Sequence, residues 1–212
     1  MSFTIIAAMS LFIAVPAFTA WARLSAIPSA YYPFLALLTI GLVNEVVSIV
    51  LIKIHGNNIT GYNIYALWLA ACTLWQFYQW KQTVVFRILL ILLVLVWLTE
   101  WYCKGSLEQY FSWFIIIRSA LICIISIYIA GYRIKLVNYI LYRDAVFLIC
   151  TAFIIYFSYA LLTELYQVWN FSIKESWHYY IAGIMSAINF LVNCIYLFAV
   201  LCIPPRICLS PH

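Results

Sequence analysis

The strongest constraint on this chain is a series of seven apolar runs, separated by short polar breaks. A membrane-spanning helix needs about 20 mostly apolar residues. Only 8% of the residues are charged and 68% are hydrophobic, whereas a soluble domain has about 25% charged residues. The sequence therefore predicts an all-α integral membrane protein, a single seven-transmembrane-helix bundle over 1–212 that contacts the lipid bilayer. Its predicted spans are 3–22, 31–53, 61–80, 84–102, 108–130, 144–167 and 177–203.

The basic residues of the loops predict the orientation of this bundle. One set of alternate loops, with the C-terminal tail, carries seven Lys and Arg: Arg23, Lys81, Arg87, Arg133, Lys135, Arg143 and Arg206. The other set carries three: Lys53, Lys104 and Lys174. Because cytoplasmic loops carry the excess of Lys and Arg, we expect the N-terminus outside and the C-terminus in the cytoplasm. The expected location is a bacterial inner (cytoplasmic) membrane.

The net charge of +5 is assigned to the same loops, where it favours contact with anionic lipid headgroups. No run of basic residues is interleaved with aromatic residues in a soluble segment, so we do not expect nucleic acid as a partner. The sequence has no Cys-x-x-Cys pair and no His-rich tract. We therefore expect no metal site and no cofactor.

Two charged residues fall well inside the predicted spans. A charged group near the middle of a bilayer costs about 2.5 to 3.5 kcal/mol on insertion scales. Glu45 shares one helix face with Gly41, Asn44 and Ser48, and Arg118 lies in the fifth span. At about 1.5 Å per residue, Glu45 is about 12 Å and Arg118 about 15 Å below the outer surface. Because their depths match, we expect them to pair, or to meet through water or a ligand; an ion pair that only fixes helix packing is the alternative.

Polar and aromatic residues of other spans reach the same layer. In the last span, His178, Asn189 and Asn193 share one face. These residues are also explained as hydrogen-bonding contacts between helices, and deep tryptophans as core packing. The convergence of several helices at one depth favours a cavity. The candidate ligand-binding residues are Glu45, Arg118, Asn44, Trp68, Tyr65, Tyr159, Glu164, His178, Asn189 and Asn193.

An enzyme is not expected. No Asp lies in the membrane core, and the chain has only three His. His178 and Ser186 are about 12 Å apart along one helix, too far for a hydrogen bond. A retinal protein needs a Schiff-base lysine in a span, and the last predicted span contains none.

Three function classes then stay open. A receptor or sensor would bind a small or lipidic ligand in an outward-facing pocket and signal through a separate cytoplasmic partner, through the basic loop 133–143. A small-solute or proton-coupled transporter would often show a repeat with broken helices, but Pro16 in the first span has no counterpart in the fifth. The third class is a structural subunit of a membrane complex. The sequence favours the receptor or sensor.

Overall fold

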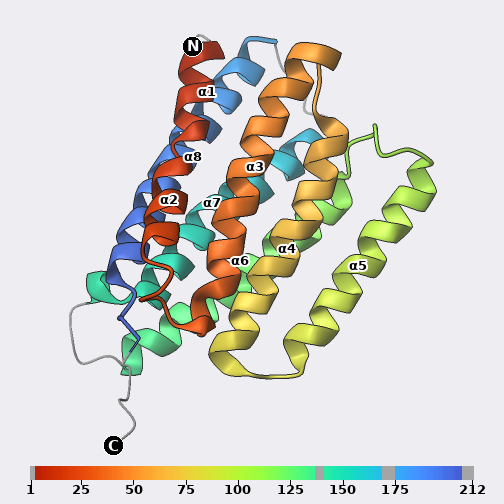
Figure 1. Cartoon of the computed structure of the whole chain (residues 1–212). Helices are drawn as coiled ribbons and strands as arrows, with labels where there is room; N and C mark the ends of the chain where they lie inside the picture. The colour runs from red at the N-terminus through yellow and green to blue at the C-terminus, as the bar shows by residue number, and fades with distance from the viewer. Residues whose placement is uncertain (1–2, 137–140, 169–174, 207–212) are drawn as a thin grey trace, which may run out of the picture.

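The computed structural model describes residues 3–136, 141–168 and 175–206, without the side chains of residues 3, 4, 175–180 and 182. All regular secondary structure in these ranges is helical (Figure 1). The elements are α1 (Phe3–Leu11), α2 (Ala14–Ala22), η1 (Ser29–Tyr31), α3 (Tyr32–His55), α4 (Ile59–Lys81), α5 (Val85–Lys104), α6 (Ser112–Leu136), η2 (Leu141–Arg143), α7 (Ala145–Val168) and α8 (Glu175–Cys202).

Six helical stretches in the described part of the chain are long and apolar enough to cross a membrane, which supports a multi-pass membrane protein. They are 5–22, 29–55, 85–104, 112–136, 145–168 and 183–202, and each overlaps one predicted span. The seventh predicted span, 61–80, corresponds to α4, which is not among these six apolar stretches. Its length matches that of its neighbours, but three tyrosines, three Asn or Gln residues and two Thr make it less apolar than they are.

The first predicted span is broken into α1 and α2. Pro16 has no N–H to donate to the carbonyl of Phe12, and a proline ring also crowds the carbonyl four residues earlier. The connection tightens instead, because the N–H of Val15 bonds to Phe12 O at 3.0 Å and that of Ile13 bonds to Ser10 O at 3.3 Å. The break therefore lies one turn before the proline, and it faces the interior at Ile13, which is 7% exposed.

The helices form a closed ring in chain order. Each long helix packs against the next, and α8 contacts α1 and α2 as well as α7, while α4 also reaches α6. Figure 1 shows α4 running alongside α3 and α5 over most of their length. An aromatic cluster joins four helices in the core, with ring centroids 5.3 Å apart for Phe34 and Tyr196, 6.1 Å for Phe153 and Tyr196, and 5.9 Å for Phe77 and Phe153.

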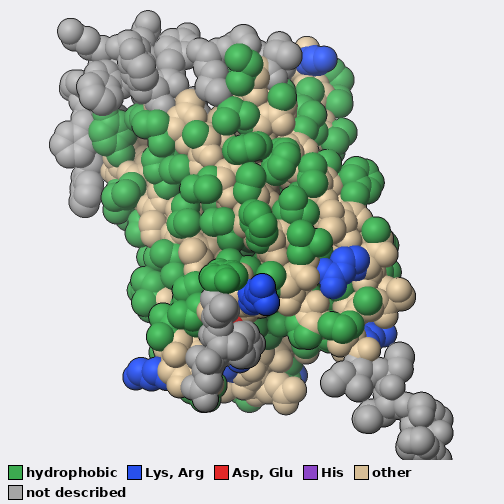
Figure 2. Space-filling model, turned by 90° about the vertical axis from the view of Figure 1, so that its left-hand side faces the viewer, with side chains coloured by type: hydrophobic (Ala, Val, Ile, Leu, Met, Phe, Trp, Pro, Cys, Tyr) green, Lys and Arg blue, Asp and Glu red, His purple; other side chains and the backbone are tan. Residues whose placement is uncertain are grey.

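The outer surface of the ring is largely apolar. Hydrophobic side chains cover most of the face drawn in Figure 2, and Lys and Arg gather mostly toward its lower end. On α5, Ile91 is 60% and Leu95 52% exposed, while Leu93 and Trp97 turn inward. This pattern gives α5 an apolar outward face.

Two buried polar side chains hold the loop between α5 and α6. Asn63 donates from Nδ2 to Leu107 O at 2.9 Å and to Gln109 O at 2.8 Å, and its Oδ1 accepts from Phe111 N at 3.3 Å. Glu100 accepts from the first N–H groups of α6 and pairs with Lys104 at 3.3 Å. Carboxylates are favourable at a helix N-terminus, so Glu100 fixes the start of α6.

Replacing Asn63 with Ala is expected to lower the free energy of unfolding by about 2 kcal/mol, because two loop carbonyls and one N–H lose their buried partner. Asn57→Ala is the matched control, since Asn57 is exposed and accepts only one long bond, 3.4 Å from Ile59 N. Its effect is expected to stay within about 0.5 kcal/mol. Denaturant unfolding of the purified variants measures both. Equal effects would mean that Asn63 does not anchor the loop.

Candidate functional site

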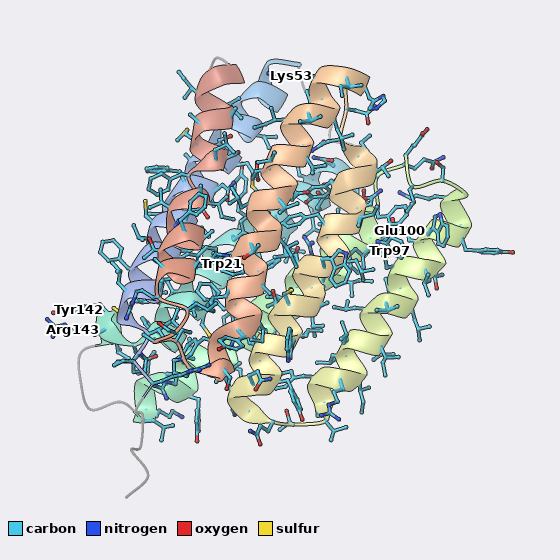
Figure 3. All side chains as sticks on the ribbon, in the orientation of Figure 1. Trp21, Lys53, Trp97, Glu100, Tyr142 and Arg143 are labelled. Atoms are coloured by element: carbon cyan, nitrogen blue, oxygen red, sulfur yellow. The ribbon has the colours of Figure 1, made fainter. Side chains whose placement is uncertain are left out.

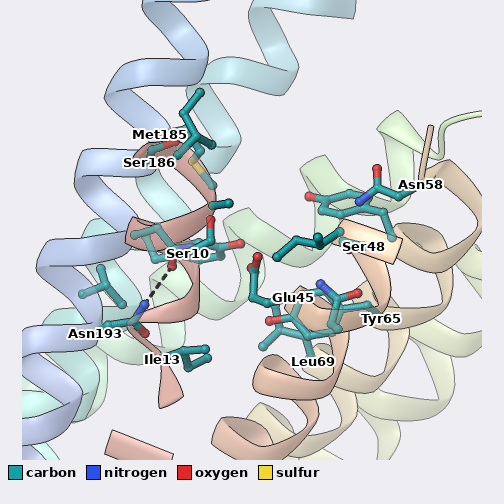
Figure 4. Close-up of a pocket in the computed structure, with 18 of the residues that line it drawn as sticks. Ser10, Ile13, Glu45, Ser48, Asn58, Tyr65, Leu69, Met185, Ser186 and Asn193 are labelled. Atoms are coloured by element: carbon teal, nitrogen blue, oxygen red, sulfur yellow. Dashed lines mark hydrogen bonds between the residues drawn. The ribbon is translucent and has the colours of Figure 1, made fainter. Parts of the chain in front are cut away.

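A polar cavity of about 250 Å³ lies between α1, α3, α4, α7 and α8. This is the volume of roughly eight water molecules. Figure 4 shows Glu45, Ser48 and Tyr65 on one side of it, with Ser10 and Asn193 opposite. We call this cavity the inner chamber. Its walls are formed by one carboxylate, four Asn, three Ser, four Tyr and a set of apolar side chains.

One face of α3 supplies the carboxylate. Asn44, Glu45 and Ser48 all line the inner chamber, which follows from their helical spacing. Glu45 points into the hollow (Figure 4) and accepts a hydrogen bond from Ser10. One turn earlier, Gly41 lets the broken first span approach closely, because a Cβ there would lie 2.5 Å from the Cδ1 atom of Ile13.

Arg118 is almost completely buried, with 1% of its surface exposed. Its Nη1 donates to Ala66 O at 3.1 Å, while Nε and Nη2 have no hydrogen-bond partner. The guanidinium carbon lies 5.5 Å from the ring centre of Phe157 and 5.9 Å from that of Phe114. Phe157 lines the inner chamber, so Arg118 lies directly behind the chamber wall.

The prediction of a direct ion pair between Glu45 and Arg118 is wrong. The two ion pairs recorded among the described residues are Glu100 with Lys104 and Asp144 with Arg133. Matched depth fixes where two residues lie along the bilayer normal, but it does not fix the distance between their helices. The two charges act electrostatically on the same hydroxyls, those of Tyr65 and Tyr156. A link through water or a ligand stays a prediction.

The amides of α8 complete the inner chamber. Asn193 Nδ2 lies 3.5 Å from Asn189 Oδ1, and this bond is drawn in Figure 4. Both residues line the chamber. Asn193 is 1% exposed, and its own Oδ1 has no partner. The chamber wall therefore carries a buried acceptor oxygen that is unused by the described protein groups.

A second hollow of about 350 Å³ adjoins the first and shares Asn58, Tyr62 and Met185 with it. We call it the outer chamber. Glu164 lines it, and this carboxylate accepts a 2.6 Å hydrogen bond from the Tyr110 hydroxyl. Burial, with the neighbouring Tyr62 and Glu164, raises the pKa of Tyr110 above its usual value, so the phenol stays protonated and donates. Oε2 of Glu164 has no partner, although the residue is only 4% exposed.

The structure does not bring every predicted site residue to these chambers. Trp68 is 56% exposed on the outside of the bundle, so its predicted place in the cavity is wrong. It lies at the edge of the polar face of its helix and turns away from Tyr65. Tyr159 lines neither chamber and donates to Ile181 O at 3.0 Å, which ties α7 to α8. The side chain of His178 lies outside the described residues.

Sequence reasoning missed the contribution of the first span. Ser10 and Ile13 line the inner chamber, and the signal for them was Pro16, which predicts an interruption one turn earlier. Tyr62 was also missed, although it borders both chambers and its ring stacks on Tyr110 at 5.4 Å and 15°. A tyrosine near the end of a predicted span is usually an interfacial residue, so its position alone gave no such signal.

The described residues contain no group of three or more His, Cys, Asp or Glu that could hold a metal ion. No protein-family model, curated protein or solved structure matches this chain.

Proposed function

We propose that this chain is a seven-helix membrane receptor or sensor, with its N-terminus outside and its C-terminus in the cytoplasm. It binds a small or lipidic ligand in the inner chamber and signals through a separate cytoplasmic partner. One observation carries the proposal: a polar chamber inside an apolar bundle has the Glu45 carboxylate on its wall, and the incompletely bonded guanidinium of Arg118 behind it. Charged residues inside membranes mark functional sites by default.

The seven-helix topology requires α4 to span the bilayer. Its 23 residues would extend about 34 Å, enough for a hydrocarbon core of about 30 Å. Asn63, Thr73 and Gln76 are fully buried, whereas Ile64 and Trp75 face outward. The polar residues that lower the average hydropathy of α4 thus point into the protein, and its lipid-facing side is apolar.

The orientation rests on the basic residues. Lys53 lies at the upper end of the bundle in Figure 3, and Arg143 lies at the opposite end. The lower end in this view also holds the connection between α4 and α5, with Lys81 at the end of α4 and Arg87 in the first turn of α5. Since the excess of Lys and Arg marks the cytoplasmic side, the upper end is outside. The outer chamber, between the starts of α4 and α8 and the end of α7, then faces outward.

The proposed signal is a shift between two helix arrangements. A ligand shifts such an equilibrium only if it binds one arrangement better. Glu45 on α3 and Arg118 on α6 carry opposite charges, and both act electrostatically on the Tyr65 and Tyr156 hydroxyls. A ligand that engages Glu45 weakens the attraction between these charges, and it thereby changes the preferred spacing of α3 and α6.

A double-mutant cycle with Glu45→Gln and Arg118→Gln tests this link. Denaturant unfolding of the wild type, both single variants and the double variant gives the coupling free energy, expected at about 0.5 to 3 kcal/mol. Cys72→Ala with Arg118→Gln is the control pair, since the Cys72 side chain is uncharged. A coupling free energy no larger than that of the control pair would contradict the proposed energetic link between Glu45 and Arg118.

A carrier is the second candidate, and the broken first span favours it. Transporters often form their solute sites at discontinuous helices, and the break between α1 and α2 places Ser10 and Ile13 on the chamber wall. Liposomes containing the purified chain can be loaded with a cell extract and moved into carbon-13-labelled extract. A carrier exchanges the label across the membrane, whereas a sensor leaves both pools separate.

A further inference from the structure

The walls of the two chambers share one electrostatic sign. Of the side chains that the structure describes, Glu45 is the single charged one lining the inner chamber, and Glu164 is the single one lining the outer chamber. Among the described residues, no Lys, Arg or His belongs to either wall. Because the chambers share Asn58, Tyr62 and Met185, a solute passes one carboxylate on its way to the other. Both walls therefore favour a cationic group.

The buried side-chain atoms on these walls that have no hydrogen-bond partner among the described groups are both acceptors. Oδ1 of Asn193 and Oε2 of Glu164 are buried without a partner, in residues that are 1% and 4% exposed. An unpaired buried acceptor costs about 1 to 3 kcal/mol, so a ligand that donates N–H bonds gains this energy. A quaternary ammonium has no N–H group, whereas a primary ammonium has three.

Aromatic rings supply the remaining recognition. Tyr62, Tyr65, Tyr156, Phe157 and Tyr196 all line the inner chamber. A cation within about 6 Å of such a ring is attracted by its negative face. The four phenol oxygens also accept hydrogen bonds. The chamber thus combines a carboxylate with aromatic faces, which is the chemistry that recognises organic cations.

Arg118 sets the charge of the ligand. It lies outside both walls, yet it acts electrostatically on Glu164 as well as on Tyr65 and Tyr156. Lys104 and Glu100 form their own ion pair and cancel each other. With both chamber carboxylates ionised, the guanidinium compensates one of them and leaves one negative charge over. A monocation therefore brings the net charge of the site to zero, whereas a dication leaves it positive.

The geometry points to a small primary ammonium compound as the ligand of the two chambers. Its nitrogen donates to Glu45 and to the Asn193 oxygen, and its short apolar part lies against the tyrosine rings. The inner chamber, at about 250 Å³, is below the usual size of drug-like pockets, which begin at about 300 Å³, so the compound is small. This inference rests on the proposed function of the same cavity.

Ser48→Cys tests the inference with probes of known charge. Ser48 lines the inner chamber three residues after Glu45, and Cys103 is an exposed native thiol that serves as an internal reference. The purified chain reacts with neutral methyl, cationic aminoethyl and anionic sulfonatoethyl methanethiosulfonates. Peptide mass spectrometry reads each site. We expect the cation-to-anion rate ratio at Ser48→Cys to exceed that at Cys103 by at least about tenfold, and Glu45→Gln to reduce this excess.

Protection then identifies the ligand class. We expect n-butylammonium to slow the neutral reagent at Ser48→Cys, whereas butyrate and 1-butanol leave its rate unchanged. Equal ratios at the two thiols, equal protection by all three compounds, or no protection would overturn the ammonium inference and leave the cavity intact. If the neutral reagent modifies Cys103 but never Ser48→Cys in the folded protein, no ligand reaches the chamber, and the proposed function itself fails.

Discussion

Replacing Arg118 with Met is expected to raise the free energy of unfolding by about 1 to 4 kcal/mol. Replacing a buried ion pair with apolar residues of similar volume often stabilises a protein by this amount, whereas removing one partner of a direct pair destabilises it. Arg118 forms neither of the two ion pairs among the described residues, so its replacement breaks no direct pair. Arg118 is 1% exposed and has one recorded hydrogen bond, so little of its desolvation is offset. Methionine fills the space between Phe114 and Phe157 without a charge. Reversible unfolding in mixed detergent micelles measures the change.

Arg87→Met is the matched control for this prediction. Arg87 is exposed near the start of α5, where it bonds to the Tyr78 hydroxyl and lies over its ring. Its replacement is expected to change stability by less than about 1 kcal/mol. A clear loss of stability in Arg118→Met would show that the guanidinium contributes to packing rather than to function.

Replacing Glu45 with Gln is expected to weaken the binding of n-butylammonium by about 10- to 100-fold. A hydrogen bond to a charged group contributes about 1.5 to 3 kcal/mol, and glutamine keeps the shape of the side chain while it removes the charge. Titration calorimetry of the purified chain measures the dissociation constant. Arg118→Met is expected to leave the affinity unchanged or higher, because it removes a positive charge behind the same wall.

Glu108→Gln controls for a general loss of negative charge. Glu108 is exposed in the loop between α5 and α6 and lines neither chamber. Its replacement is expected to leave the affinity within about twofold. If Arg118→Met abolishes binding and Glu45→Gln does not, the ligand is anionic and the assignment of its charge is reversed.

The helices were predictable because length and apolarity are local properties of the sequence. Each predicted span overlaps an observed helix, even at the weakly marked boundary between α4 and α5, where Gln82 adopts a left-handed conformation with φ of 49°. The break in the first span was less visible. Pro16 indicated an interruption, but its consequence, that Ser10 and Ile13 line a cavity wall, depends on packing against α3 through Gly41.

The sequence predicted the depth of the site residues in the bilayer, but not which way each side chain points from its helix. The helical spacing of Asn44, Glu45, Asn189 and Asn193 placed them at one level, and all four line the inner chamber. Rotation about each helix axis was harder to infer. Trp68 turned outward because it stands at the edge of the polar face of α4, where a sequence pattern does not decide between cavity and lipid.

Buried residues that bond to backbone groups escaped prediction for another reason. Asn63 and Glu100 bind the loop between α5 and α6 and the start of α6. Their partners are N–H and C=O groups that every residue carries, so no residue type in the loop marks the contact. The same holds for Gln76, which bonds to Phe34 N and Ala30 O at 2.8 and 2.7 Å.

Whether the Glu45 chamber opens to the outer side of the membrane is tested most directly by labelling in right-side-out membrane vesicles. The membrane-impermeant reagent is trimethylammonioethyl methanethiosulfonate, applied to Ser48→Cys, with Cys103 and Thr83→Cys as references for the two sides. Thr83 is exposed between α4 and α5, at the end opposite Cys103. Labelling of Ser48→Cys and Cys103 in sealed vesicles, with Thr83→Cys labelled only after permeabilisation, is the predicted result. Labelling of Ser48→Cys only after permeabilisation, or of Cys103 and Thr83→Cys from the same side, would contradict it.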